Sequence, residues 1–272
     1  MWFALQESEV QALGRMRLDW NYTFLRGNRY DQVFNADQSL IGTRRHHRKT
    51  HLAEWRLRYG LRERLEADAE IMYQAYRQHT HSDGDEHDRN DDGDFERYFA
   101  GLSYQALRES ATRPAVRLRG GMRFPNRAEN EGIGQELGLE ALAALGKRLG
   151  EVRVGAMAGF SVTCDNHDQP ADPIFSATPY SKGHDLRTLA YGIGMAYPAS
   201  ARWQVNLELA GRIADTIRLN RRIHQSQLTA TPGVIWAADP GRRDVWVGLG
   251  LPVGLTNETD HIGVTVRVGM RL

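Results

Sequence analysis

The chain has 272 residues, with 35 Lys or Arg, 34 Asp or Glu and a formal net charge of +1. This balance excludes the strong basic bias of a general nucleic-acid-binding protein. A single cysteine, Cys164, excludes an internal disulfide and has no partner at zinc-ligand spacing. No apolar run reaches about 18 residues, so no transmembrane helix is expected. Since no Pro- or Ser-rich linker divides the chain, we expect one large domain.

Alternation of apolar and polar residues predicts β-strands throughout the chain, because side chains two positions apart share a strand face. In LEADAEIMY (65–73), Glu66, Asp68 and Glu70 alternate with Leu, Ala, Ile and Tyr. A helix would scatter both sets around its axis, so the strand is favoured although Ala, Glu and Leu are good helix formers. The pattern predicts twelve strands, at 15–24, 54–61, 65–73, 98–106, 115–124, 135–145, 151–162, 189–197, 202–212, 228–236, 246–255 and 261–272.

The connections between these strands alternate in length. Short turns such as RER, PASA and DPGRRD follow every second strand, and longer polar stretches lie between them at 26–50, 78–94, 125–134, 164–185 and 214–226, with a short TNETD at 256–260. This arrangement predicts an all-β protein, an up-and-down antiparallel transmembrane β-barrel of about 12 strands with short periplasmic turns and long extracellular loops. Residues 1–14 are expected to form a periplasmic N-terminal segment and residues 15–272 the barrel.

The apolar strand face is rich in aromatic residues, among them Trp20, Trp55, Tyr104 and Trp203. Aromatic residues at the rims of an apolar band are typical of a bilayer interface, although a closed soluble barrel would show the same alternation. We expect location in a bacterial outer membrane. MWFALQESEV lacks a basic n-region, so an export signal is absent from this chain.

Strand and turn motifs also carry a family resemblance. The stretches are LRYGLRERLEADAEIMY, FAGLSYQALRESATRPAVRLRGGMRFP, LGLEALAALGKRLGEVRVGAMAGF, YGIGMAYPASARWQVNLELAG, LTATPGV and VTVRVGMRL. In these units the sequence resembles Gram-negative outer-membrane proteins of the "MetA-pathway of phenol degradation" type, which are channel-forming transporters. The resemblance covers most of residues 50–272 and implies fold and location. One departure is the end of the chain, Leu272, where such barrels usually have an aromatic residue.

If the apolar face meets lipid, the other face lines the lumen. We predict that the lumen-lining residues are Arg17, Asp19, Glu54, Arg56, Arg58, Glu66, Asp68, Glu70, Arg117, Arg119, Arg123, Glu136, Glu140, Arg153, Glu208, Arg212 and Arg267. Charges removed from bulk water must pair or line water. One interpretation is a polar pathway for solutes, and the other is a lumen closed by salt bridges.

The predicted function is therefore an outer-membrane channel or transporter for small organic solutes, aromatic or charged, through a charged lumen. The alternative is a non-conducting barrel that serves as a structural anchor or assembly partner. The expected partners are outer-membrane lipid, lipopolysaccharide and a small-molecule solute, without nucleic acid. We expect no enzyme and no cofactor, because neither a Gly-x-Ser-x-Gly motif nor a Ser, His and acid on adjacent inward positions is present.

Two charge runs in the longer stretches have opposite sign, the basic Thr43 to His51 and the acidic His81 to Asp94. They could attract each other or remain solvated, and the basic run could bind lipopolysaccharide phosphates. Asp88 to Asp94 match the start of a calcium loop, but Phe99 stands where the bidentate Glu is needed. The histidines in and beside these runs are His46, His47, His79, His81 and His87. Their spacing matches no known metal-binding pattern, so no metal site is predicted.

Overall fold

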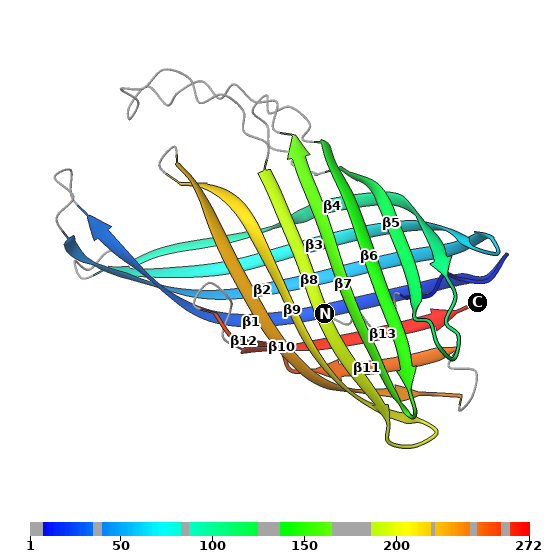
Figure 1. Cartoon of the computed structure of the whole chain (residues 1–272). Helices are drawn as coiled ribbons and strands as arrows, with labels where there is room; N and C mark the ends of the chain where they lie inside the picture. The colour runs from blue at the N-terminus through cyan, green and yellow to red at the C-terminus, as the bar shows by residue number, and fades with distance from the viewer. Residues whose placement is uncertain are drawn as a thin grey trace.

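Thirteen antiparallel segments make up the computed structural model of the chain (Figure 1). It describes residues 8–34, 40–82, 87–124, 137–164, 186–218, 221–239, 244–256 and 262–272. The strands are β1 (Met16–Phe34), β2 (Leu40–Arg62), β3 (Leu65–Ser82), β4 (His87–Leu107), β5 (Ala115–Phe124), β6 (Leu137–Leu149), β7 (Val152–Cys164), β8 (Leu186–Pro198), β9 (Trp203–Arg218), β10 (Arg221–Ala237), β11 (Val245–Gly250), β12 (Val253–Gly254) and β13 (Ile262–Arg271).

From β1 to β11 each strand pairs with its neighbours in sequence, and β1 pairs with β13 to close the sheet. The closure extends to the chain end, where the backbone N–H groups of Met16 and Leu272 donate to each other's carbonyl oxygens at 3.0 and 2.8 Å. β11 and β12 both lie between β10 and β13, so they form one interrupted strand of the barrel. The prediction of a closed, twelve-stranded, up-and-down barrel is therefore confirmed.

The interruption between β11 and β12 falls at Leu251 and Pro252. Proline has no backbone N–H and cannot donate to a ladder, so it is found at strand edges and bulges. The neighbouring strands stay connected through single bonds, from the N–H of Leu251 to the Pro232 carbonyl at 2.9 Å and from that of Gly263 to the Pro252 carbonyl at 2.8 Å. The barrel wall is thus continuous here, although its ladder is irregular.

Three of the predicted long loops are wrong. Residues 26–34 and 40–50 continue β1 and β2, residues 78–82 and 87–94 continue β3 and β4, and most of 214–226 continues β9 and β10. Their polar composition indicates contact with water, but a ladder needs only paired backbone groups and can continue beyond the apolar band. Long hairpins on β1–β4 therefore extend from one end of the barrel (Figure 1).

The other end carries the short connections at 63–64, 108–114, 150–151, 199–202 and 238–244, and we call it the turn end. The opposite end is called the loop end. Near the turn end the outer face is mostly apolar and exposed, whereas the inner face carries buried polar, charged or small side chains. Leu57, Ile193 and Leu207 are 41%, 57% and 43% exposed, and Arg58 and Glu66 are fully buried. The core of this protein is therefore ionic and lies inside the barrel.

Among the described residues, no helix has the length and apolar character needed to cross a membrane.

Candidate functional site: the charged lumen

Sixteen of the predicted lumen residues fall within the described chain, and Glu136 lies outside it. Eleven of them are buried, at relative exposures of 0–7%: Arg17, Asp19, Arg56, Arg58, Glu66, Asp68, Glu70, Arg117, Arg119, Glu208 and Arg267. Glu54, Arg123, Glu140 and Arg153 are half-buried, and Arg212 is exposed. All occupy the strand positions that alternate with the apolar outer face. Whether they line a solute pathway stays a prediction.

One cluster of charges gathers around Asp19 on β1. Arg17 donates to Oδ1 of Asp19 at 2.8 Å, and Arg58 on β2 donates to Oδ2 at 2.8 Å. Arg267 on β13 contributes a third cation, with its Nη2 3.7 Å from Oδ1. A carboxylate has two oxygens and about four acceptor positions, so it can hold several guanidinium groups at once. Three strands are therefore joined through a single carboxylate at the place where the barrel closes.

A second cluster is centred on Asp68 of β3. Arg56 on β2 makes a bidentate contact with its two oxygens, at 2.9 Å from Nε and 2.5 Å from Nη2. Arg117 and Arg119 on β5 reach the same carboxylate at 3.2 Å each. These arginines pass over β4, whose Ser103 accepts a hydrogen bond from Arg117 at 2.7 Å. Asp68 thus connects strands that are not neighbours in the sheet.

The other acids of β3 and β6 extend this second cluster around the wall. Glu66 accepts a hydrogen bond from Arg117 at 2.6 Å, and Glu70 accepts one from Arg119 at 3.0 Å. Glu140 on β6 lies 3.3 Å from Arg119 and also pairs with Arg123. The charged wall therefore runs without interruption from β13 through β1 to β6.

Two inward aromatic rings lie within the charged wall. The Phe99 ring is stacked under Arg119, whose guanidinium carbon is 3.9 Å from the ring centroid. Trp246 on β11 faces Arg17 and Arg267 at 5.5 and 5.2 Å. Such cation–π contacts are strengthened where water is excluded. Both rings lie against glycines, because a Cβ added at Gly121 or at Gly269 would overlap them.

A segment of the chain itself, Ser8 to Gly14, occupies the lumen at the turn end. The N–H of Gln11 donates to Glu66 at 2.7 Å. Gln105 on β4 accepts from the N–H of Val10 at 2.9 Å and donates to the Ser8 carbonyl at 2.9 Å. These partners lie on the polar inner face, so the segment crosses the interior rather than the outer surface.

The same segment reaches the opposite side of the lumen. Arg153 on β7 lies 3.2 Å from the Ser8 hydroxyl and 3.2 Å from the Glu9 carboxylate. At Gly60 on β2 and Gly146 on β6 the wall has no side chain, and an added Cβ would overlap Ala12 and Ser8 respectively. Glycine at these two positions permits the close approach of the segment to the wall.

Burial on the facing wall shows how completely this level of the lumen is filled. Small inward side chains there would be exposed in an open bore, yet Ala144, Ala196 and Ala237 are 0%, 3% and 2% exposed. Nearer the loop end, Arg123 has a side-chain exposure of 26%, and Arg212 is exposed. Within the described residues, the lumen is thus closed toward the turn end and hydrated toward the loop end.

Several contributors to this site were not predicted from the sequence. They are Ser103, Gln105, Phe99, Trp246 and the segment Ser8–Gly14. The strand positions of the first four follow from alternation, but nothing in the sequence says that they join the charges. Inward glycines at 60, 121 and 146 were the available signal, because a missing side chain often indicates close approach of another group.

The loop-run predictions lie mostly outside the described side chains. These include His46, His79, His81 and His87 and the acids from Asp88 to Asp94. The backbone of 88–94 is nevertheless an extended part of β4 paired with β3, rather than the turn of a calcium loop. In the part of the chain with described side chains, no group of three or more His, Cys, Asp or Glu residues is placed to hold a metal.

An apolar outside, an ionic inside and twelve closed antiparallel strands define a β-barrel of the bacterial outer-membrane type. No family model matches the chain, and no curated protein matches it.

Solved structures do match. The chain is similar to the COG4313 outer membrane channel from Pseudomonas putida F1, at 12% identity and a TM-score of 0.65, over 98% of each chain. It is also similar to the transport unit of the autotransporter AIDA-I from Escherichia coli, at 8% identity and a TM-score of 0.55, over 99% of this chain and 92% of that one. These likenesses show the fold, and the resemblance to the phenol-degradation family stays a prediction.

Proposed function

We propose that this protein is an outer-membrane channel for small charged organic solutes, closed in the present conformation by its own N-terminal segment. Three features of the molecule support this function: the outer face, the charge of the lumen and the segment Ser8–Gly14.

The outer face supports location in a bilayer. Large apolar side chains cover it, and burying them against protein would be the norm in a soluble barrel. Near the turn end a belt of aromatic residues follows the strand ends, formed by Tyr59, Tyr104, Tyr197, Trp203 and Trp236. A second aromatic group lies further along, formed by Trp20, Tyr22, Trp55, Tyr73 and Tyr98. The belt near the turn end matches the aromatic girdle that flanks the apolar band of outer-membrane barrels, whereas the second group begins in the middle of the band, at Trp20 and Trp55.

The lumen supports a charged solute. Among the described residues, the ion pairs within the barrel wall involve seven arginines and five carboxylates, an excess of two positive charges; they are Arg17, Arg56, Arg58, Arg117, Arg119, Arg123 and Arg267 with Asp19, Glu66, Asp68, Glu70 and Glu140. The pair between Arg153 and Glu9 of the segment leaves this excess unchanged. Charged side chains that line a pore set its ion selectivity. An excess of arginine favours anions, so organic anions are the preferred class.

The observation that carries the proposal is the nature of the closure. Ser8–Gly14 is held by hydrogen bonds to polar groups such as Glu66 and Gln105, not by burial of large apolar side chains. Water or a solute can replace such bonds with little net cost, because each contributes only about 1 kcal/mol. A plug attached in this way can leave the lumen while the barrel stays folded. The similar fold of a solved outer membrane channel supports the same function.

The test uses two glycines of the wall. Gly60→Ala and Gly146→Ala each place a methyl group where the segment lies, so they should displace it and raise conductance in planar lipid bilayers. Gly248→Ala is the matched control, because it adds the same group to the lumen on β11, where the nearest atom is an ordinary 3.5 Å away. Equal conductance of all three variants and the parent would refute the plug.

A second candidate function is a non-conducting barrel that acts as an anchor or assembly partner. The burial of inward side chains on both sides of the lumen, including Arg58 and Ala144 at 0% exposure, favours it. The two functions separate in the same experiment. A correctly folded barrel that shows no channel events even with the segment displaced is a structural element and not a channel.

A further inference from the structure

Three cations form a row across the outer face of the barrel, in register on three adjacent strands. Arg26 on β1 is paired with Lys49 on β2, and Lys49 is paired with Arg77 on β3. All three side chains are exposed. We call Arg26, Lys49 and Arg77 the cationic row.

The residues below the cationic row are nearly all apolar. Toward the turn end, the same three strands present five registered rows on this face, Phe24/His51/Ala75, Tyr22/Ala53/Tyr73, Trp20/Trp55/Ile71, Leu18/Leu57/Ala69 and Met16/Tyr59/Ala67. The sole polar member, His51, hydrogen-bonds the Tyr22 hydroxyl at 2.7 Å.

The height of this apolar band fixes the level of the cationic row. A strand rises about 3.3 Å per residue and is tilted by about 40° in such barrels, so the step from Met16 to Arg26 corresponds to about 25 Å along the axis. That is the height of the apolar band of an outer-membrane barrel. The cationic row therefore lies where the acyl chains of one leaflet end and the headgroups begin.

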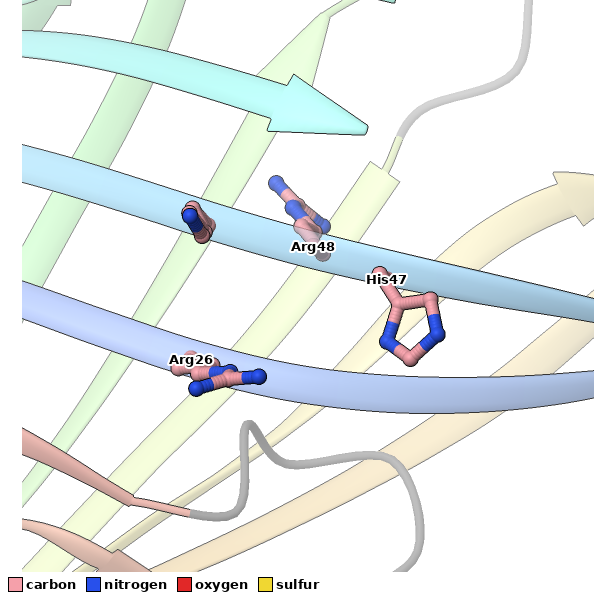
Figure 2. A pocket seen from close by; sticks show the side chains of 4 residues that line it. Arg26, His47 and Arg48 are labelled. Carbon is pink, nitrogen blue, oxygen red and sulfur yellow. The ribbon is translucent and has the colours of Figure 1, made fainter. Parts of the chain in front are cut away.

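A cavity opens beside the row. Its volume is about 270 Å³, and it is lined by Arg26, His47, Arg48 and Lys49 (Figure 2). Figure 2 shows that these residues come from two neighbouring strands, β1 and β2. Among the described lining residues, Arg26, His47 and Lys49 occupy outward strand positions and Arg48 the inward position between His47 and Lys49. The cations Arg26 and Lys49 favour an anion with several acceptor oxygens on the outer face. On the far side of the row, Arg77 is in register with Asp91 of β4, so Arg26 and Lys49 form the centre of the site.

We propose that Arg26 and Lys49, with Arg77 beside them, bind the phosphate groups of a phosphorylated glycolipid headgroup of the lipid A type. A free phosphate would find similar charges, but only a lipid also uses the five apolar rows directly below, where its acyl chains would lie along Phe24 and Trp20. This inference rests on the proposed function in one respect, namely that the barrel spans an outer membrane with its loop end in the glycolipid leaflet.

The experiment measures lipid binding to the full chain in detergent micelles. Probes are bisphosphorylated lipid A, the same lipid without phosphates, and inorganic pyrophosphate as a soluble competitor. The double variant Arg26→Gln/Lys49→Gln should bind bisphosphorylated lipid A about tenfold more weakly, since two charge-assisted contacts are lost. The control Arg62→Gln/Arg64→Gln removes two exposed cations at the turn end and should bind as the parent does.

Three outcomes would overturn the inference. The first is that the double variant binds bisphosphorylated lipid A as tightly as the parent does, and the second is that the parent binds the dephosphorylated lipid equally tightly. The third is that pyrophosphate displaces the lipid with an affinity equal to that of the lipid, which would indicate a site for free anions. Failure here is distinguishable from failure of the proposed function. If the Gly146→Ala variant inserts in vesicles and conducts but the protein does not bind lipid A, only the lipid site is contradicted.

Discussion

Arg17 and Arg58 lie directly opposite each other on β1 and β2, with both side chains buried. Like charges at such a cross-strand position normally destabilise a sheet. Here both guanidinium groups donate to Asp19, at 2.8 Å each, so the negative carboxylate offsets the repulsion between the two cations. The closure between β1 and its neighbours therefore depends on this single acid.

The first prediction concerns Asp19→Asn. The change removes the carboxylate charge that both Arg17 and Arg58 contact and should destabilise the barrel by about 3–5 kcal/mol, as expected for a broken buried ion pair. Urea unfolding in detergent, followed by the shift of the folded band on unheated gels, measures it. Asp239→Asn at an exposed turn position is the control and should unfold like the parent. Equal unfolding midpoints for Asp19→Asn and the control would contradict the role of Asp19.

The second prediction concerns the selectivity of the open lumen. In the Gly146→Ala background, Glu70→Gln removes one carboxylate that contacts Arg119 at 3.0 Å and leaves the larger Asp68 cluster in place. The reversal potential in a salt gradient should move toward anion selectivity, because the lumen loses one negative charge while Arg119 keeps its contacts with Asp68 and Glu140. Glu63→Gln, whose 83% exposed side chain lies at the turn end, should leave it unchanged. If Glu70→Gln also leaves it unchanged, Glu70 does not line the pathway.

The third prediction compares two adjacent glycines of β5. An alanine at position 121 would bring its Cβ to 2.5 Å from both the Phe99 ring and the backbone oxygen of Ala100 and would displace the ring from Arg119, whereas at position 120 the nearest atom is 3.8 Å away. Overpacking of this kind costs about 1–3 kcal/mol. Gly121→Ala should therefore lower the urea midpoint, and Gly120→Ala should keep or raise it. If both variants lose stability, the cause is the effect of alanine on the strand backbone and not the displacement of the Phe99 ring.

The fourth prediction tests whether the outer face contacts lipid, by comparing two apolar side chains of similar size and identical exposure. Ile193 in the middle of β8 and Leu149 at the end of β6 are both 57% exposed. In lipid, an arginine near the midplane costs about 2–4 kcal/mol and one near the interface about 0–1 kcal/mol. Ile193→Arg should therefore be clearly less stable than Leu149→Arg in vesicles. Equal effects would indicate that depth is irrelevant and that the face does not meet lipid.

Alternation predicted the barrel because the inner and outer faces of each strand differ in polarity. Glu66, Asp68 and Glu70 were placed on one face by period alone, and all three are buried there. Strand ends were not predictable in the same way. In β2 the ladder continues to Leu40 through the polar run at 43–51. Residues on both faces of the strand are polar there, so apolar and polar residues no longer alternate and the strand cannot be recognised from the sequence.

Sequence could not predict which charges share a partner. Arg117 meets Glu66 although about fifty positions separate them, and this contact depends on the register of three strands. The lumenal position of Ser8–Gly14 was equally hidden, because a short segment held by backbone hydrogen bonds needs no periodic pattern. The break at Pro252 was not predicted either, since 246–255 was expected to be one strand and Pro232 lies within β10 without interrupting it.

The direction of the ion pairs has a mechanical consequence. Arg58 to Asp19, Arg117 to Glu66 and Arg119 to Glu140 each join strands that are neighbours or next neighbours around the circumference. These bonds stiffen an arc of the cylinder from β13 to β6, and they do not brace it across its diameter. Widening of the bore through the arc from β7 to β11 would therefore leave this set of salt bridges intact.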